Sequence, residues 1–223
     1  YHLFGGKSHL PSIDLGEKLM GLAPPSVSKV FFNNSGSEAN DTAIKIIWYY
    51  NNARGRHLKK KIIGRINGYH GITLAASSLT GRPVNHAGFD VPLQNFIHTN
   101  NPHYYKFGEE GETEEDFATR MADDLDKMII EEGPETVAAF FAEPIMGAGG
   151  VVTPPKTYFA KVQAVLKKHD VLFVADEVIC GFMRTGNYWA CETFDIQPDI
   201  LVCAKALSSS YLPISGTIIS DDI

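Results

Sequence analysis

Two carboxylates and a lysine follow apolar runs of the sequence, at positions where their chemistry depends strongly on their surroundings. Asp176 and Glu177 follow the run VLFVA (171–175), and Lys205 follows the run ILVCA (200–204). A carboxylate carried to a largely buried edge is costly unless a cationic group faces it. Partial desolvation of a lysine frees its amine to attack carbonyl carbons. Asp176 and Lys205 could equally pair only with each other, and these residues alone leave that alternative open.

A glycine turn before a predicted helix offers an anion site. The strand candidate Lys29–Asn33 is followed by Asn34–Asn40 (NSGSEAN), and apolar residues three to four apart predict a helix from about 37 to 52. We expect Ser37 to be its N-cap. Free N–H groups at a helix start, two hydroxyls and a glycine that allows close approach suit a phosphate. The same segment is also a plausible plain helix cap, so the signal is weak by itself.

An aromatic pair between glycines follows the second strand candidate. Lys61–Ile66 is followed by Asn67–Gly71 (NGYHG). The ring of Tyr69 offers a platform for a planar ligand, although an aromatic residue can equally anchor a loop. His70 has the chemistry of a base, but the sequence shows no partner for it, which favours a structural role.

Two glycine-containing segments do not match nucleotide-binding motifs. Glu143–Gly150 (EPIMGAGG) follows the strand candidate Val137–Phe141, but its glycines lack the Gly-x-Gly-x-x-Gly spacing. Residues 6–8 (GKS) resemble only the end of a P-loop, without the first glycine or a preceding strand. We therefore expect neither a dinucleotide fingerprint nor a P-loop.

The four features together match the requirements of pyridoxal phosphate (PLP). Its phosphate needs a helix start, its ring an aromatic face, its protonated pyridine nitrogen a carboxylate, and its aldehyde a lysine. The sequence meets all four in segments that follow predicted strands. PLP is therefore the cofactor that we expect.

The elements that must position these residues alternate between apolar strands and helices. A helix is predicted over Lys156–His169, and the acidic segment 109–135 (12 Asp/Glu, 2 Lys/Arg) carries one apolar stripe typical of an amphipathic helix. Continuous apolar strands separated by helices predict an α/β fold, with a mostly parallel central sheet and helices on both faces. Ligands bind at the carboxyl ends of such strands. The predicted strands are Lys29–Asn33, Lys61–Ile66, Asn95–His98, Val137–Phe141, Val171–Ala175, Ile200–Ala204 and Pro213–Ile219.

Composition excludes several classes of protein. The chain has 223 residues, and 20 Lys/Arg against 26 Asp/Glu give a net charge of −6, so no nucleic-acid partner is expected. Three cysteines without a Cys-x-x-Cys pair argue against disulfides and zinc, and favour the reducing cytoplasm. No apolar run is long enough for a membrane span. We expect one cofactor-binding domain over 1–223. Its start at Tyr1 and its end directly after an apolar run suggest a fragment.

Six segments carry a family resemblance: Asn34–Asn40, Gly68–Gly71 (GYHG), Glu143–Gly150, Asp176–Gly186 (DEVICGFMRTG), Gln197–Asp199 (QPD) and Ala204–Pro213 (AKALSSSYLP). In this order and spacing they resemble class III aminotransferases, which are fold-type I PLP enzymes. Within that family the chain is most similar to pyruvate-dependent ω-aminotransferases, including the 4-aminobutyrate–pyruvate type. The resemblance covers nearly the whole chain.

The resemblance implies a role for each residue that contacts the reacting part of the cofactor. Lys205 would be the Schiff-base lysine and would also move the proton between substrate and cofactor. Asp176 would keep the pyridine nitrogen protonated, and Glu143 would lie beside the cofactor and orient it.

The resemblance also assigns the remaining cofactor contacts and the reactants. Gly36 and Ser37 would bind the phosphate, while Tyr69 stacks on one ring face and Val178 packs on the other. A ping-pong cycle would move an amino group from an ω-amino acid or amine to a keto acid. No metal is implied.

Some positions depart from the family pattern. Met183 stands where the family usually has Gly, Ser215 follows Ile214 where Gly is usual, and Ser210 replaces a Gly or Ala. Relatives that use 2-oxoglutarate often carry a second Glu five residues after the first Glu of EPIMGAGG. Here Ala148 occupies that position, which favours pyruvate as acceptor.

Family members are also longer than this chain. They carry a C-terminal small domain with a substrate-binding arginine, and form dimers in which a neighbouring threonine completes the phosphate site. We therefore expect a fragment that lacks an N-terminal segment and this small domain, from a protein that is a homodimer. Two alternatives remain: a PLP-dependent aminomutase of the glutamate-semialdehyde type, and a truncated non-catalytic domain.

Overall fold

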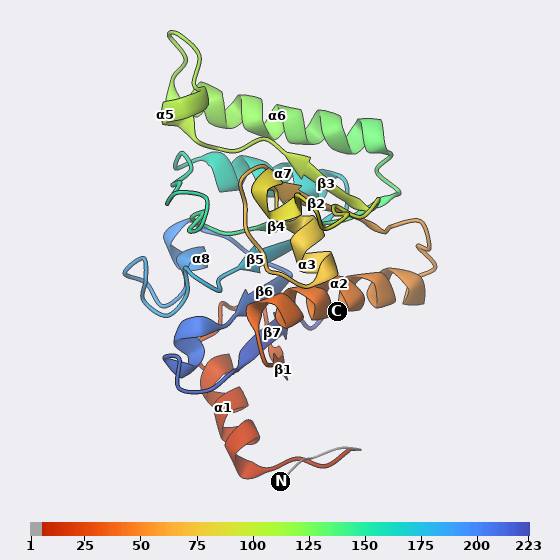
Figure 1. The fold of residues 1–223 in the computed structure, drawn as a ribbon, viewed down its shortest axis with the longest axis vertical. Helices are drawn as coiled ribbons and strands as arrows, with labels where there is room; N and C mark the ends of the chain where they lie inside the picture. Colours follow the sequence, from red (N-terminus) through yellow and green to blue (C-terminus); the bar gives the residue numbers. More distant parts are fainter. Residues whose placement is uncertain (1–5) are drawn as a thin grey trace.

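The centre of the molecule is a seven-stranded sheet with the strand order β1-β7-β6-β5-β4-β2-β3. The computed structural model describes residues 6–223 (Figure 1). The pairs β2/β3, β2/β4, β4/β5 and β5/β6 are parallel, whereas β7 is antiparallel to both β1 and β6. The strands are β1 (Lys29–Asn33), β2 (Lys61–Arg65), β3 (Phe96–Thr99), β4 (Val137–Ala142), β5 (Leu172–Asp176), β6 (Ile200–Cys203) and β7 (Ser215–Ile219).

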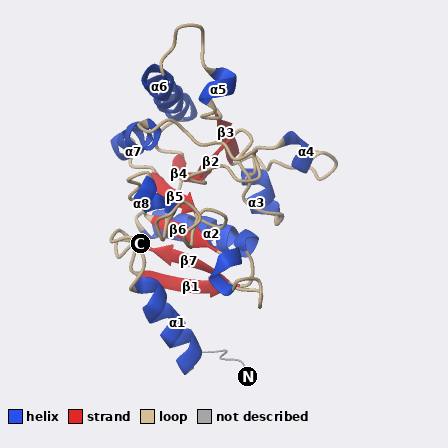
Figure 2. Cartoon of the chain, turned by 90° about the vertical axis from the view of Figure 1, so that its left-hand side faces the viewer, coloured by secondary structure: helices blue, strands red, loops and turns tan. Residues whose placement is uncertain are grey.

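Helices cover both faces of the sheet. Figure 2 shows α6, α7 and α8 on one side and α3 and α4 on the other, and α1 lies beyond the β1 edge. The helices are α1 (Leu10–Met20), α2 (Gly36–Ala53), α3 (Leu74–Leu79), α4 (Pro83–His86), α5 (Tyr104–Phe107), α6 (Glu114–Glu132), α7 (Tyr158–Lys168) and α8 (Ala190–Thr193), with a 3₁₀ helix over Lys205–Ser208. The predicted α/β class with a mostly parallel sheet is confirmed.

Two hydrophobic cores lie on opposite faces of the same strands. Every residue of β4 and β6 is buried, as their continuous apolar sequences predict. Side chains alternate between the faces along each strand. Phe140 therefore joins the core under α6 and α7, and its neighbour Phe141 joins the core under α2.

The acidic segment forms the predicted amphipathic helix. Helix α6 begins at a capping box in which Thr113 and Asp116 exchange hydrogen bonds. Its buried face includes Phe117, Leu125 and Ile129. The remaining acidic side chains face solvent, which explains how a strongly negative segment can cover a core.

The structure corrects two expectations. Ser35, not Ser37, is the N-cap of α2, because the Ser35 hydroxyl accepts from the N–H of Glu38 at 3.2 Å. The run predicted as the strand Pro213–Ile219 begins only at Ser215, and it runs antiparallel to β6, from which residues 204–214 turn the chain back. Between residues 6 and 223, no helix is long and apolar enough to cross a membrane.

Candidate active site

The strand directions bring the predicted chemical groups to one edge of the sheet. β1 and β6 are both antiparallel to β7, and β5 is parallel to β6, so β1, β5 and β6 point the same way. Asn33, Asp176 and Cys203 are their last residues. The α2 start, the two carboxylates and Lys205 all follow these strand ends, where α/β sheets bind ligands.

A cavity of about 200 Å³ lies at this edge. It contains all seven residues predicted from the sequence together with four others. The predicted residues are Gly36, Ser37, Tyr69, Glu143, Asp176, Val178 and Lys205, and the others are His70, Gly71, Ile72 and Ile179.

Asp176 is held at the end of β5 by three hydrogen-bond donors. Its Oδ2 accepts from Nδ2 of Asn40 at 2.9 Å and lies 2.8 Å from Nδ1 of His70. Its Oδ1 accepts from the N–H of Val178 at 3.1 Å. The residue is only 3% exposed, so these contacts replace the water that a buried carboxylate loses.

The start of α2 presents free donors toward the cavity. Among residues 6–223 the N–H groups of Gly36 and Ser37 have no hydrogen-bond partner, as expected for the first turn of a helix. The Ser37 hydroxyl accepts from the N–H of Ile72 at 3.0 Å, which ties this turn to the loop after Tyr69. The positive end of the 18-residue helix favours an anion at this place.

Two glycines allow the walls of this cavity to approach one another. A Cβ on Gly36 would lie 3.0 Å from Cγ2 of Val178. A Cβ on Gly71 would lie 2.4 Å from Oγ of Ser37, and the backbone there has a φ of +141°. The backbone at Gly71 therefore requires glycine for the aromatic loop and the helix start to meet, and a side chain at Gly36 would need Val178 to shift.

Glu143 joins two loops beneath the cavity. Its Oε1 accepts from the N–H of Tyr69 and its Oε2 from the N–H of Gly147, each at 3.0 Å. Burial raises the pKa of Glu143; the charges of His70 and Arg65 oppose this shift. With both oxygens occupied by backbone donors, this carboxylate positions the Tyr69 loop.

Arg65 supports the Glu143 segment from below. Its guanidinium is buried, donates to the carbonyl of Glu143 and lies over the Phe159 ring, with 5.8 Å from Cζ to the ring centroid. A guanidinium is always charged, so it also provides the nearby carboxylate with a favourable electrostatic environment. No feature of the sequence had singled out this residue.

Lys205 differs from the sequence expectation in two respects. β6 ends at Cys203, and Lys205 begins a 3₁₀ helix with a backbone φ of +45°, which is uncommon for a residue with a side chain. The residue is exposed rather than partly desolvated. Among the described residues it forms no ion pair with Asp176, whose partners are the donors given above, so the simple pairing alternative is not observed.

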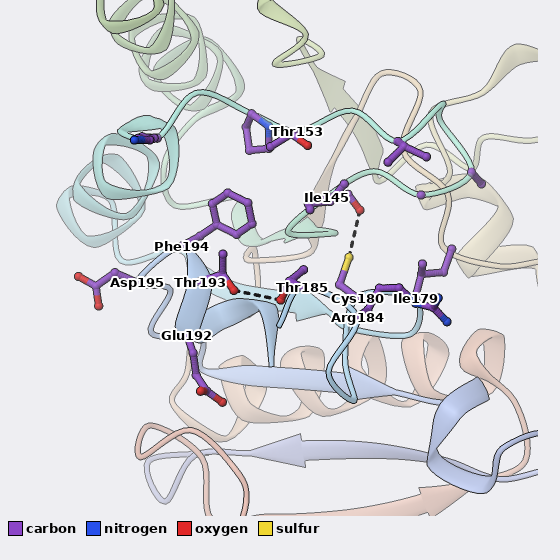
Figure 3. A pocket seen from close by; sticks show the side chains of 15 residues that line it. Ile145, Thr153, Ile179, Cys180, Arg184, Thr185, Glu192, Thr193, Phe194 and Asp195 are labelled. Atoms are coloured by element: carbon purple, nitrogen blue, oxygen red, sulfur yellow. Dashed lines mark hydrogen bonds between the residues drawn. The ribbon is translucent and has the colours of Figure 1, made fainter. Parts of the chain in front are cut away.

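A second, larger cavity of about 950 Å³ adjoins the first through Ile179, which lines both. Its lining is largely apolar, and Figure 3 shows Ile145, Thr153 and Phe194 around it. Ala148, where some relatives carry a second Glu, also lines this cavity. An amine that reached the first cavity would therefore meet apolar surface beside it.

The sequence analysis missed the partners of Asp176. His70 had been interpreted as structural because its partner, 106 residues away, is visible only in the fold. Asn40 had been noted only as the last residue of the segment Asn34–Asn40. The available signal was its place on the apolar, inward face of α2, where a buried amide needs polar partners.

The site fits PLP by its donors and shape. Unpaired N–H groups and a hydroxyl meet at a helix start, and a carboxylate held by donors and an exposed lysine line the same cavity. In the part of the chain that is described, no group of His, Cys, Asp and Glu could hold a metal ion.

Comparisons with known proteins agree with this arrangement. A family model described as aminotransferase class-III matches residues 1–223. Gamma aminobutyrate transaminase 3, chloroplastic, of Solanum lycopersicum is 54% identical over the whole chain, which spans 43% of that protein. Probable gamma-aminobutyrate transaminase 2, mitochondrial, of Oryza sativa subsp. indica is 55% identical, and the chain spans 45% of it. The chain thus spans less than half the length of these curated relatives.

Solved structures give the same result for the fold. A crystal structure of the omega transaminase from Pseudomonas jessenii in complex with PMP is 59% identical, with a TM-score of 0.98 over all of this chain and 49% of that one. A structure described as a transaminase with L-ala is 61% identical, with a TM-score of 0.97 over 99% of this chain and 52% of that one.

Proposed function

Because the chain belongs to the class-III aminotransferase family, whose members use PLP, we propose that it forms the cofactor-binding part of an ω-aminotransferase. The reaction would move an amino group from an ω-amino acid or amine to a keto acid. The observation that carries this proposal is the convergence of a helix start, a buried carboxylate and a lysine on one cavity.

Each side chain of the cavity has a proposed part in holding the cofactor. Gly36 and Ser37 would donate backbone N–H groups to the phosphate, and the Ser37 hydroxyl would add a further donor. Tyr69 and Val178 would pack against opposite faces of the ring. Oδ1 of Asp176 would accept a hydrogen bond from the protonated ring nitrogen, because Oδ2 already has two partners.

Lys205 is the proposed catalytic residue. When bound, PLP supplies an aldehyde that takes up the amino group and a ring that withdraws electrons. The Lys205 amine would remove the proton from the carbon that bears the donor's amino group and deliver it to the cofactor carbon that had carried the aldehyde, and the second half of the cycle would reverse this transfer onto the keto acid. Its exposure leaves this amine free of competing partners before a ligand arrives.

Pyruvate is the proposed acceptor. Ala148 gives an apolar surface where 2-oxoglutarate-using relatives often carry a carboxylate. A relative at 61% identity is described with L-alanine, the amino acid that corresponds to pyruvate. Both observations support a small, singly charged keto acid.

A homodimer is the proposed assembly. Ile72 lines the cofactor cavity yet is 81% exposed, and Leu74 beside it is 67% exposed. Apolar side chains at the rim of an active site support a covering polypeptide. Light scattering of the cofactor-loaded protein should give twice the mass of one chain.

The cytoplasm is the proposed location. Cys180, Cys191 and Cys203 are free and buried, which supports a reducing compartment. The plant relatives carry mitochondrial or chloroplastic names, so fractionation of the source cells is the direct test.

The test of the function begins with the absorption spectrum of the purified protein with added PLP. We expect a visible band that borohydride abolishes, with the reduced label on the Lys205 peptide, and no such label in Lys205→Ala. Incubation with 4-aminobutyrate or an arylalkylamine should then yield alanine from pyruvate faster than glutamate from 2-oxoglutarate. Labelling elsewhere would contradict the proposed catalytic residue, and faster glutamate formation would contradict the proposed acceptor.

A further inference from the structure

Asn40 links helix α2 to Asp176 and to the loop that carries Tyr69, although it does not line the cavity. It lies on α2, one turn after Gly36, and its exposed fraction is zero. Its Nδ2 donates to Oδ2 of Asp176 at 2.9 Å and to the carbonyl of His70 at 2.7 Å. One amide group therefore contacts the carboxylate at the ring end and the backbone beside the aromatic platform.

The contacts fix the orientation of this amide. Both partners of Nδ2 are acceptors, so a flipped amide would place oxygen against two oxygens. In the observed orientation Oδ1 of Asn40 is buried without a partner among the described residues. A buried acceptor without a partner is unfavourable, and here the two hydrogen bonds that Nδ2 donates offset that cost.

The donors around Asp176 suit a carboxylate that accepts and never donates. Asn40 and Val178 supply N–H groups, and His70 supplies its ring nitrogen. Replacement of the Asn40 amide by an apolar group would remove one donor from a carboxylate that is only 3% exposed. Asp176 would then be free to rotate, and a ring N–H would lose an acceptor held in place.

We infer that Asn40 is a positioning residue that holds the Asp176 carboxylate in the orientation needed to accept a hydrogen bond from the ring nitrogen of the cofactor. This inference rests on the proposed function, because it concerns the same PLP site. Its position on α2 also couples that carboxylate to the phosphate-binding turn: Gly36, Ser37 and Asn40 belong to one rigid helix.

The test compares two ligands in the purified protein. One is PLP, and the other is 1-deaza-pyridoxal phosphate, in which carbon replaces the ring nitrogen. Asn40→Leu should weaken the binding of PLP by about tenfold, as measured by equilibrium dialysis, because a hydrogen bond to a charged group is affected. The affinity for the deaza compound should stay within about twofold, since Asp176 has nothing to accept from it.

A matched control is available on the same helix. Asn51 is also a buried amide on α2, and among residues 6–223 its Nδ2 donates only to the carbonyl of Ile47. Asn51→Leu should leave both affinities unchanged. Asn40→Ala removes the same donor without adding a charge or bulk and should show the same selective loss, which covers the case in which Asn40→Leu does not fold.

Three results would overturn the inference. In the first, Asn40→Leu and Asn40→Ala bind PLP as the parent does. In the second, both ligands weaken equally, which would mean that Asn40 only supports the helix. In the third, the parent itself does not bind PLP, and then the proposed function fails together with this inference.

Discussion

Asp176 and Glu177 are neighbours in the sequence but have opposite surroundings. Asp176 receives donors from Asn40, His70 and Val178. Glu177 accepts from the N–H of Cys191 at 2.7 Å, while its Oε2 has no partner among the described residues. Burial raises the pKa of Glu177 to about 7, against which the donors at Cys191 and Ala190 act only weakly. Two adjacent carboxylates thus differ because one faces the ligand cavity and the other the core.

This difference predicts a pH dependence of stability that belongs to Glu177. The pKa is raised in the folded state from 4.5 to about 7, so between these values the folded protein keeps a proton that the unfolded chain releases. The free energy of unfolding must therefore fall as the pH rises through this window. Glu177→Gln removes the titration and keeps an oxygen that accepts from Cys191. Relative to this variant, the parent should lose roughly 2–3 kcal/mol between about pH 5 and about pH 8.

Urea unfolding followed by circular dichroism at a series of pH values measures this effect. Glu112→Gln is the control, because Arg120 lowers the pKa of Glu112 to about 2 and this carboxylate does not titrate within the window. Parallel pH profiles for the parent and Glu177→Gln would contradict the assignment.

At the scale of elements, apolar sequence predicted the strands well and their ends less well. The runs VAAFFA (137–142) and ILVC (200–203) are buried on both faces, so their sequence and their environment agree. Pro213 and Ile214 had been included in β7, although they complete the loop that turns the chain back. The exposed helix α1 was not predicted, because its apolar residues contact little of the core.

The residues of the candidate site were likewise predictable only in part. Residues next to strand ends and in the turn before α2 could be predicted, because sheet direction alone brings them together. The partners of Asp176 could not, since Asn40 and His70 lie 136 and 106 residues away and become neighbours only after the sheet forms. Lys205 lines the cavity, but its exposure and its positive φ at the start of a 3₁₀ helix were not predicted.

The contact between the aromatic loop and the start of α2 gives an element-scale prediction. In Gly71→Ala, the new Cβ would lie 2.4 Å from Oγ and 2.8 Å from Cα of Ser37, so the loop or the helix turn must move. We expect the affinity for PLP to fall by more than about tenfold, because the N–H groups of this turn are the proposed donors to its phosphate. Equilibrium dialysis measures the loss.

A glycine with the same backbone constraint but open space provides the control. Gly150 has a φ of +109°, and a Cβ added there would meet nothing within 4 Å. Gly150→Ala should cost about 1 kcal/mol of stability from backbone strain and leave the affinity for PLP nearly unchanged. Equal losses of affinity in both variants would show that strain, not contact with Ser37, limits binding.

At the scale of the whole molecule, two cores share one sheet. The core under α2 and the core under α6 and α7 are built on alternate residues of the same strands, so neither can form without the strands that support the other. We propose on this ground that residues 6–223 unfold as one domain. The ligand cavity lies at the end of this shared sheet and adjoins the α2 core.

Phe140 and Phe141 separate these two cores experimentally. Both side chains are fully buried in β4, but the Phe140 ring packs against Phe173, with centroids 5.6 Å apart, and the Phe141 ring meets His70 edge-on at 6.2 Å. Replacement of either by Leu should reduce the free energy of unfolding by about 1–2 kcal/mol. In both variants, far-UV and near-UV circular dichroism should report one coincident transition, and separate transitions would mean that the two cores unfold independently. Only Phe141→Leu should also weaken PLP binding, because only Phe141 supports the imidazole that contacts Asp176.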